Sequence, residues 1–213
     1  MPRRHSRLYL LLCLAASTIH AQVPKPISGF YGDHTLQLVA APDGSFTGSF
    51  YDETVAGQFT CGFLIKSTTP PSKDGVYKII SWWPAKELGE PVDDEVVNGT
   101  LRVSANRLTL QLPKDAHGGC WNVNADLNNG QPIDLDRDQA EPTWKALRVV
   151  KAKRVPLLHQ PTPSAPSRPY IVQGDVVIVT GKQGSWLHIV YNAYSSSKTF
   201  TGWVQDSDLL PAT

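Results

Sequence analysis

Clustered carboxylates are the first residues of this sequence whose spacing could support chemistry. Acidic residues alternate along the run Asp134–Asp138, and Glu141 follows three positions later. Hard cations such as Ca²⁺ bind clustered carboxylate oxygens. The EF-hand pattern, however, needs Gly at its sixth position and Glu at its twelfth, where this run has Gln139 and Lys145. We therefore expect a solvated strand edge or loop here and no metal site.

Candidate nucleophiles and bases form no recognisable catalytic set. The sequence lacks the Gly-x-Ser-x-Gly motif, which marks the nucleophile turn of α/β-hydrolases. His117 lies three residues before Cys120 in a Gly-rich segment, where we expect a turn and a solvated histidine. We predict that the protein is not an enzyme and that it uses no cofactor.

Two adjacent tryptophans, Trp82 and Trp83, precede an acidic segment. Side chains alternate between the two faces of a strand, so one indole can be buried while the other faces solvent or a neighbouring element. An exposed indole near Glu90, Asp93 and Asp94 would suit a basic protein partner or a sugar. Alternatively, the acidic segment folds over the second tryptophan as a covering loop.

The N-terminus has the layout of a secretory signal. Three arginines within the first seven residues precede the apolar run Leu8–Ala16, and Ala21 ends a pattern suited to signal-peptidase cleavage. The apolar run is much shorter than the roughly 20 residues that span a bilayer. We expect residues 1–21 to be a signal peptide and the mature protein to be periplasmic or secreted, without a membrane span.

Cys61 and Cys120 are the cysteines of the expected mature chain. In an exported protein an isolated pair is most simply a disulfide. Cys61 shares one strand face with Phe59, Phe63 and Ile65, so its side chain should point into the core. Closing a loop of about 60 residues would stabilise the fold by up to ~4 kcal/mol in the chain-entropy model.

Short alternating runs separated by Gly, Pro, Asn and Asp predict an all-β protein. A first hairpin joins residues 35–41 to residues 45–51 through the turn Pro42-Asp43-Gly44. Further strands are expected at 58–65, 75–83, 95–103 and 107–112, and the segment 118–121 should open another. Seven or more strands before residue 125 are enough for an antiparallel barrel or sandwich.

The last third of the chain carries a spaced set of motifs. They are Val155-Pro156-Leu157-Leu158, then Val172-Gln173-Gly174-Asp175-Val176, then Gly184-Ser185-Trp186, then Gly202-Trp203-Val204 and Leu209. Their order and spacing resemble the bacterial SH3 domain, a small β-barrel. The resemblance implies an SH3-like domain at 146–213 after an N-terminal all-β domain at 22–145. It also implies that Trp186 and Trp203 cover the ends of a small core. The Pro-rich segment 161–169 falls within a strand pattern, so we expect it to be a long hairpin loop inside this domain.

Domains similar to bacterial SH3 modules bind cell-wall peptides or proteins in exported enzymes and receptors. The resemblance therefore points to the aromatic residues of this domain as a stacking surface, namely Tyr170, Trp186, Tyr191 and Trp203. In the N-terminal domain, the hairpin around Pro42-Asp43-Gly44 resembles the first hairpin of avidin-type barrels. The tryptophan strands of avidins are not recognisable, so this second resemblance bears on architecture and not on biotin.

Charge and motifs together predict an exported binding protein of the bacterial envelope. The chain has 20 basic and 19 acidic side chains, and residues 1–21 hold three of the basic ones, so the mature protein is nearly neutral and no nucleic-acid surface is indicated. Its partner would be a protein, as for an inhibitor, an immunity-like protein or a partner of cell-wall machinery. The alternative is a cell-wall peptide, a glycan or a small ligand. The sequence leaves this choice and the oligomeric state open.

Overall fold

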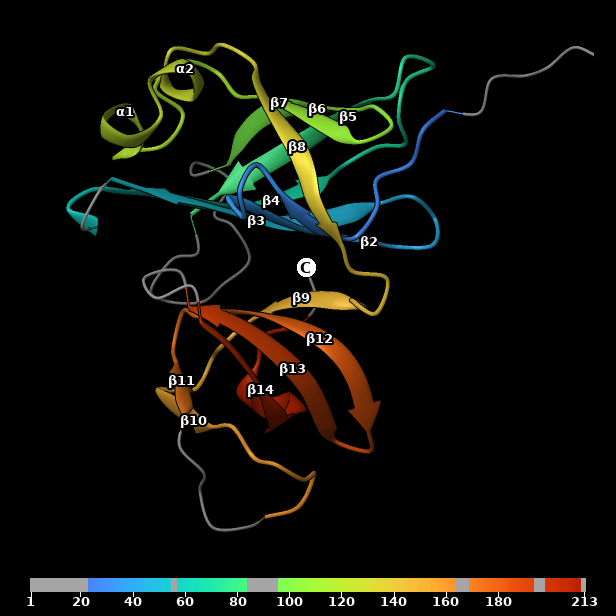
Figure 1. Cartoon of the computed structure of the whole chain (residues 1–213), viewed down its shortest axis with the longest axis vertical. Coiled ribbons are helices and arrows are strands. Elements are labelled where there is room, and N and C mark those ends of the chain that lie inside the picture. Colours follow the sequence, from blue (N-terminus) through green and yellow to red (C-terminus); the bar gives the residue numbers. More distant parts are fainter. Residues whose placement is uncertain (1–22, 55–56, 84–95, 164–168, 194–197, 212–213) are drawn as a thin grey trace, which may run out of the picture.

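A computed structural model describes residues 23–54, 57–83, 96–163, 169–193 and 198–211. The expected signal peptide lies outside the described residues, and so do the acidic residues Glu90, Asp93 and Asp94. No helix in the described part of the chain is long and apolar enough to cross a membrane. The described elements are almost all strands, which confirms the all-β prediction (Figure 1).

Eight antiparallel strands close into a barrel, which occupies the upper part of Figure 1. Each strand pairs with the next one along the chain, and β8 closes the circle by pairing with β1. The strands are β1 (Gly29–Tyr31), β2 (Leu36–Ala40), β3 (Phe46–Glu53), β4 (Thr60–Ser67), β5 (Val76–Trp82), β6 (Val97–Val103), β7 (Arg107–Gln111) and β8 (Ile133–Ala140). Of the two architectures that the strand pattern allowed, the barrel is the one that forms.

The hairpin of β2 and β3 shows how local sequence builds the barrel wall. In its turn, Gly44 has a φ of 90°, in the left-handed region that favours glycine, and Asp43 Oδ1 accepts a hydrogen bond from the Ser45 amide at 2.9 Å. Alternate residues of β2, Leu36 and Leu38, then point inward. Inward apolar side chains from all eight strands fill the barrel, so its interior is a packed core and not a ligand cavity.

Two short helices cover this core where a further strand was expected. They are α1 (Cys120–Val123) and α2 (Ala125–Asn128). The strand prediction for residues 118–121 was wrong because Gly119, at a φ of 86°, turns the chain into α1, and Asn124 then caps α2 by accepting the Leu127 amide at 3.0 Å. Cys120 of α1 is bonded to Cys61 of β4, and both are buried. The predicted disulfide is confirmed, and it ties the helices to the barrel wall.

The rest of the chain forms a four-stranded sheet in the order β14-β13-β12-β9 and a separate two-stranded sheet, β10-β11. The strands are β9 (Ala146–Val149), β10 (Arg154–Pro156), β11 (Tyr170–Val172), β12 (Val176–Gln183), β13 (Trp186–Ala193) and β14 (Lys198–Gln205), and a 3-10 helix follows at Asp206–Asp208. Because β10 and β11 are antiparallel partners, the Pro-rich segment 161–169 connects the two strands of a hairpin, as predicted.

Strand β12 of the four-stranded sheet is buried on both faces over its first half. In β12, Val177 and Val179 belong to the core of the C-terminal unit. Their neighbours Val176 and Ile178 point the other way and pack in a second core that includes Trp82 of the barrel. Four consecutive buried residues are the expected pattern for a strand covered on both faces. The barrel and the C-terminal unit therefore share an apolar interface, which we call the shared core.

Three aromatic side chains lie away from the cores in which they were expected. Leu187 and Val204 point into the C-terminal core, so the adjacent Trp186 and Trp203 point to the opposite face of the sheet, where both are half-buried. The prediction that these tryptophans close the small core is therefore wrong. Phe59 was expected to face the barrel core, but it precedes β4 and is exposed.

Candidate functional site

A cleft of about 700 Å³ lies between the barrel and the four-stranded sheet. The shared core holds the two units together beside it and consists of Phe30, Val39, Leu64, Trp82, Trp144, Leu147, Val149, Val176 and Ile178. Phe30 and Trp144 belong both to this core and to the lining of the cleft. The volume is in the range typical of ligand sites, whereas the barrel interior is filled. The cleft is therefore the candidate site.

The barrel side of the cleft is acidic. Its lining includes Asp33, Asp52, Glu53 and Glu141. Hydrogen bonds hold two of these carboxylates in place: the Tyr51 hydroxyl donates to Glu53 Oε2 at 2.8 Å, and Asp52 Oδ1 accepts the Glu53 amide at 2.9 Å. The lining also includes His34 of the barrel and one lysine, Lys198, which comes from the opposite wall. Four carboxylates facing one lysine favour a cationic ligand.

The turn between β1 and β2 is strained where it borders this acidic wall. Gly32, Asp33 and His34 have φ values of 65°, 55° and 68°. For a residue other than glycine this left-handed conformation costs roughly 1 kcal/mol or more. Contacts around His34 hold the turn, since its amide donates to Asp138 Oδ2 at 2.8 Å and its ring lies 4.5 Å from that of Phe30. The barrel thus fixes the position of Asp33 in the wall.

The wall from the C-terminal unit is mostly neutral and rich in hydroxyl groups. It includes Thr180, Asn192, Thr199 and Thr201. Asn192 connects the two walls because its Nδ2 donates to Oε1 of the buried Gln37 at 3.2 Å. Thr199 in turn donates to Asn192 Oδ1 at 2.9 Å. This wall can hydrogen-bond the backbone or the polar side chains of a ligand, while the acidic wall selects its charge.

The tandem tryptophans separate as strand alternation predicts. Trp82 is 4% exposed and belongs to the shared core, where Lys66 Nζ lies 5.6 Å from its ring. Trp83 is 45% exposed. Trp82 therefore joins the two units, and of this pair Trp83 is the one that can meet a ligand.

The four aromatic residues expected to form a stacking surface in the C-terminal unit are not gathered in one groove. Tyr170 is exposed and lies under the Arg154 guanidinium, 3.7 Å from its ring centroid. Tyr191 packs against the C-terminal core, and its hydroxyl donates to Asp175 Oδ1 at 3.2 Å. Trp186 and Trp203 lie on the other face of the sheet. None of the four lines the cleft.

His117 is buried, so the prediction of a solvated loop residue is wrong. The helices α1 and α2 cover this end of the barrel, where the His117 ring stacks on Phe63 at 4.6 Å and its Nε2 lies 2.9 Å from Oγ of the fully buried Ser81. Burial lowers the pKa of His117 to about 4. A serine and a histidine at this distance resemble a nucleophile and its base, but neither one lines the cleft. We interpret the pair as a hydrogen bond within the core.

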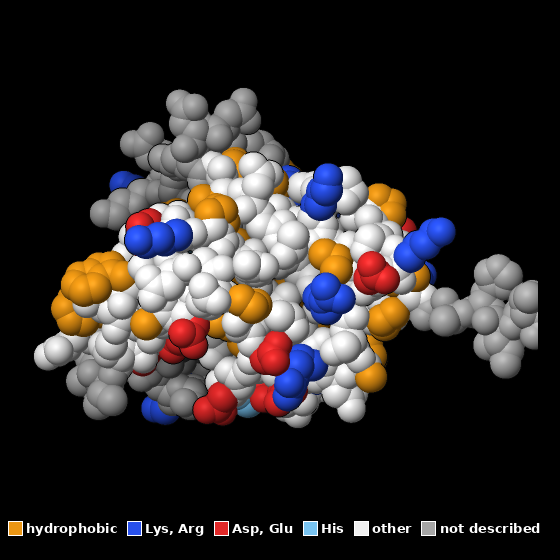
Figure 2. Space-filling model, turned by 90° about the horizontal axis from the view of Figure 1, so that it is seen from above, with side chains coloured by type: hydrophobic (Ala, Val, Ile, Leu, Met, Phe, Trp, Pro, Cys, Tyr) orange, Lys and Arg blue, Asp and Glu red, His pale blue; other side chains and the backbone are white. Residues whose placement is uncertain are grey.

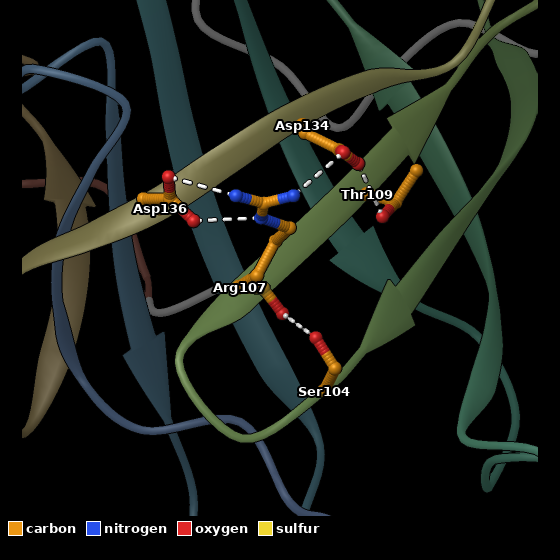
Figure 3. A network of polar contacts seen from close by, with 5 residues as sticks. All are labelled: Ser104, Arg107, Thr109, Asp134 and Asp136. Carbon is orange, nitrogen blue, oxygen red and sulfur yellow. Dashed lines mark hydrogen bonds and ion pairs between the residues drawn. The ribbon is translucent and has the colours of Figure 1, made fainter.

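The acidic run of β8 forms ion pairs on the barrel surface (Figure 3). Arg107 of β7 lies between two carboxylates, with Nη1 3.0 Å from Asp134 and Nε 2.6 Å from Asp136. Thr109 also donates to Asp134 at 2.7 Å, and the guanidinium lowers the pKa of the Asp136 carboxyl. Among the described residues, no three His, Cys, Asp or Glu side chains are grouped to hold a metal ion.

The acidic wall was not found from the sequence, because its members lie far apart in the chain. Asp33 follows β1, and the pairing of β1, β2 and β3 brings it to Asp52 and Glu53 at the end of β3. Glu141 follows β8 and joins them only when β8 closes the barrel on β1. The face shown in Figure 2, seen from above the barrel, instead mixes acidic and basic side chains.

Comparisons of the chain with protein-family models, curated proteins and solved structures find no match. The resemblance of residues 146–213 to bacterial SH3 domains therefore depends on sequence motifs alone and stays a prediction. The function has to be inferred from the geometry and the charge of the cleft.

Proposed function

We propose that the protein is exported to the bacterial envelope and acts without catalysis, by binding a positively charged segment of a partner protein in the cleft. The observation that carries this proposal is the acidic wall of Asp33, Asp52, Glu53 and Glu141 facing a neutral, hydroxyl-rich wall. Complementary charge speeds encounter and fixes the register of a bound partner. The neutral wall would then bind the backbone of that segment.

Two features support a location outside the cytoplasm. The buried Cys61–Cys120 bond is of a kind that persists in oxidising compartments. The N-terminal arginines and apolar run have the layout of an export signal. The C-terminal unit, which we propose to be SH3-like, supplies the second wall of the cleft.

A glycan fits the cleft less well than a cationic peptide. Sugar rings stack on open aromatic faces, and two aromatic residues of the lining, Phe30 and Trp144, are only 9% and 6% exposed. The third, Tyr51, is half-buried, and its hydroxyl is bonded to Glu53. Carboxylates in fixed positions favour an ammonium or guanidinium group instead. A cell-wall peptide with a free amino group shares this chemistry, so the test must separate it from a protein.

The test is capture by the immobilised mature protein and by the variant Asp33→Asn/Asp52→Asn. Asparagine tolerates the left-handed backbone of residue 33, and at residue 52 it can still accept the Glu53 amide, so the variant removes charge with little change in shape. The matched control is Asp74→Asn/Asp126→Asn, which removes two exposed carboxylates outside the cleft. We expect one stoichiometric protein from periplasmic extract on the wild type and on the control, and a loss of at least tenfold on the cleft variant.

Two further measurements complete the test: the salt dependence of capture, and binding to purified peptidoglycan. Capture through exposed charges should weaken as salt rises, because screening shortens the range of the interaction. Retention on purified peptidoglycan without a protein partner would replace the proposal by the cell-wall alternative. Equal capture by the wild type and by both variants would show that the acidic wall does not bind the partner.

A further inference from the structure

Trp83 and Tyr51 meet over one glycine on the outer surface of the barrel. A Cβ atom added to Gly62 of β4 would lie 3.4 Å from Tyr51 Cδ2 and 3.9 Å from Trp83 Cη2. The missing side chain thus lets two aromatic rings approach the same point of the sheet. Trp83 remains 45% exposed in this position, so much of its ring is open to a ligand.

Tyr51 connects this aromatic pair to the acidic wall. It lies opposite Gly62 in the register of β3 and β4, and it lines the cleft together with Glu53. Its hydroxyl donates to Glu53 Oε2 at 2.8 Å and so holds the carboxylate at the edge of the Tyr51 ring. A carboxylate has about four lone-pair positions, so Glu53 can accept further hydrogen bonds while it is bonded to Tyr51.

Aromatic faces beside a carboxylate are suited to a cation, and an arginine suits them best. The face of an indole attracts positive charge. A guanidinium group is planar, stacks on aromatic rings and can donate to a carboxylate through two parallel hydrogen bonds. A pair in the C-terminal unit shows the first of these contacts, since the Arg154 guanidinium lies 3.7 Å from the ring centroid of Tyr170.

We propose that Trp83, Tyr51 and Glu53 form a subsite for an arginine side chain of the partner. The inference depends on the proposed function, because it names the side chain through which the positive charge of the bound segment is recognised. Lys66, the cation on β4, lies over Trp82 and not over Trp83. The subsite would lie at the outer end of the acidic wall, which Tyr51 and Glu53 both line.

The probes are N-acetyl-arginine amide and its citrulline counterpart, which has the same shape without the charge. Their binding is followed by the NMR signal of the Trp83 indole N–H, identified by its loss in Trp83→Leu. We expect the arginine probe to shift this signal and to bind about two- to fivefold more tightly than citrulline. Glu53→Gln should remove most of that difference, whereas Trp121→Leu, which changes an exposed indole on α1, should leave it intact.

Several outcomes would overturn the subsite. Equal shifts with arginine and citrulline would exclude recognition of charge, and shifts with N-acetylglucosamine oligomers in place of arginine would indicate a sugar site. Capture of the partner separates this inference from the proposed function. If Trp83→Leu captures the partner as the wild type does while Asp33→Asn/Asp52→Asn does not, the subsite is wrong and the cleft proposal stands. If all three proteins capture it equally, the cleft proposal itself fails.

Discussion

The two sides of the barrel wall carry different outward-facing residues. On β2, β4 and β5 the outward side chains include Val39, Leu64 and Trp82, and the C-terminal sheet covers them. On β7 and the first half of β8 they include Arg107 and Asp134, which pair with each other and are about half exposed (Figure 3). We call these sides the covered wall and the open wall. Both walls face the same packed interior, so the outward residues alone distinguish them.

This difference shows what gives the cleft its fixed shape. Apolar side chains on the covered wall bring the C-terminal sheet against the barrel, and the cleft lies beside that contact. On the open wall, charged side chains pair with each other across neighbouring strands instead. Stability should therefore depend strongly on outward residues of the covered side and weakly on those of the open side.

The largest expected effect comes from Trp144→Ala in the shared core. Trp144 is 6% exposed, and its ring meets that of Phe30 edge-on at 4.9 Å. Removal of a buried tryptophan side chain costs about 3–5 kcal/mol, so we expect a loss of this size in the free energy of unfolding, measured in urea. Trp121→Ala is the control, because Trp121 is 66% exposed and its loss should cost less than about 0.5 kcal/mol. Equal losses in the two variants would show that the shared core does not stabilise the protein.

The next effect concerns the interior side of the covered wall and depends on pH. His117 has a pKa of about 4 in the folded protein, below its ordinary value of 6.5, because it is buried next to Ser81 of β5. The unfolded chain therefore takes up a proton at a higher pH than the folded one. The contribution of His117 to stability is complete above pH 6.5, and we expect on the order of 2 kcal/mol to be lost as the pH falls toward 4.

Unfolding in urea at a series of pH values measures this effect. Burial raises the pKa of the Asp175 and Asp208 carboxyls, which act in the opposite direction, so only the difference between variants isolates His117. His117→Gln should lose stability less steeply than the wild type between pH 6.5 and pH 4. Substitution of the exposed His159 by Gln should leave the slope unchanged. A slope in His117→Gln as steep as in the wild type would contradict the prediction.

The local parts of this fold could be predicted from the sequence, because they depend on neighbours in the chain. Strand alternation and the turn residues Pro42-Asp43-Gly44 predict the first hairpin, and alternation also predicts that Cys61 points inward. The bond to Cys120 was predicted because two cysteines in an exported protein most simply form a disulfide. Alternation also explains why Trp82 is buried and Trp83 is exposed. Each of these predictions needs only the two-residue alternation of side chains along a strand, or the presence of one pair of cysteines.

The candidate site could not be predicted, because it depends on contacts between distant segments. The acidic wall needs β1 and β8 to pair before Asp33 and Glu141 can share a surface. His117 was expected in solvent because nothing local shows that α1 and α2 cover the barrel end. One signal was present and not used: the run Val176–Val179 is apolar at every position, which indicates a strand covered on both faces and hence a second layer beside it.

The smallest expected effect is that of Arg107→Ala on the open wall. Arg107 and its partners Asp134 and Asp136 are largely exposed, with side-chain exposures of 46%, 52% and 69%. Exposed ion pairs gain little over hydration, because water already stabilises each charge and the attraction is screened by salt. The urea midpoint of Arg107→Ala should therefore differ from that of the wild type by no more than the scatter between repeats, at low and at high salt.

Arg148→Ala provides the comparison for Arg107→Ala, because Arg148 lies in β9, the strand that packs against the covered wall. Its side chain is only 12% exposed, and it pairs with Asp206 at 3.1 Å and donates to the Leu210 carbonyl. Without it, the Leu210 carbonyl loses its donor and the packing of a nearly buried side chain is lost, whereas Asp206 is 35% exposed and keeps Lys182 at 3.2 Å. We expect a clear drop in the urea midpoint that persists in high salt. A larger drop in the urea midpoint for Arg107→Ala than for Arg148→Ala would contradict this prediction. The ion pairs on β7 and β8 would then stabilise the closed barrel, and the distinction between a covered and an open wall would not describe its stability.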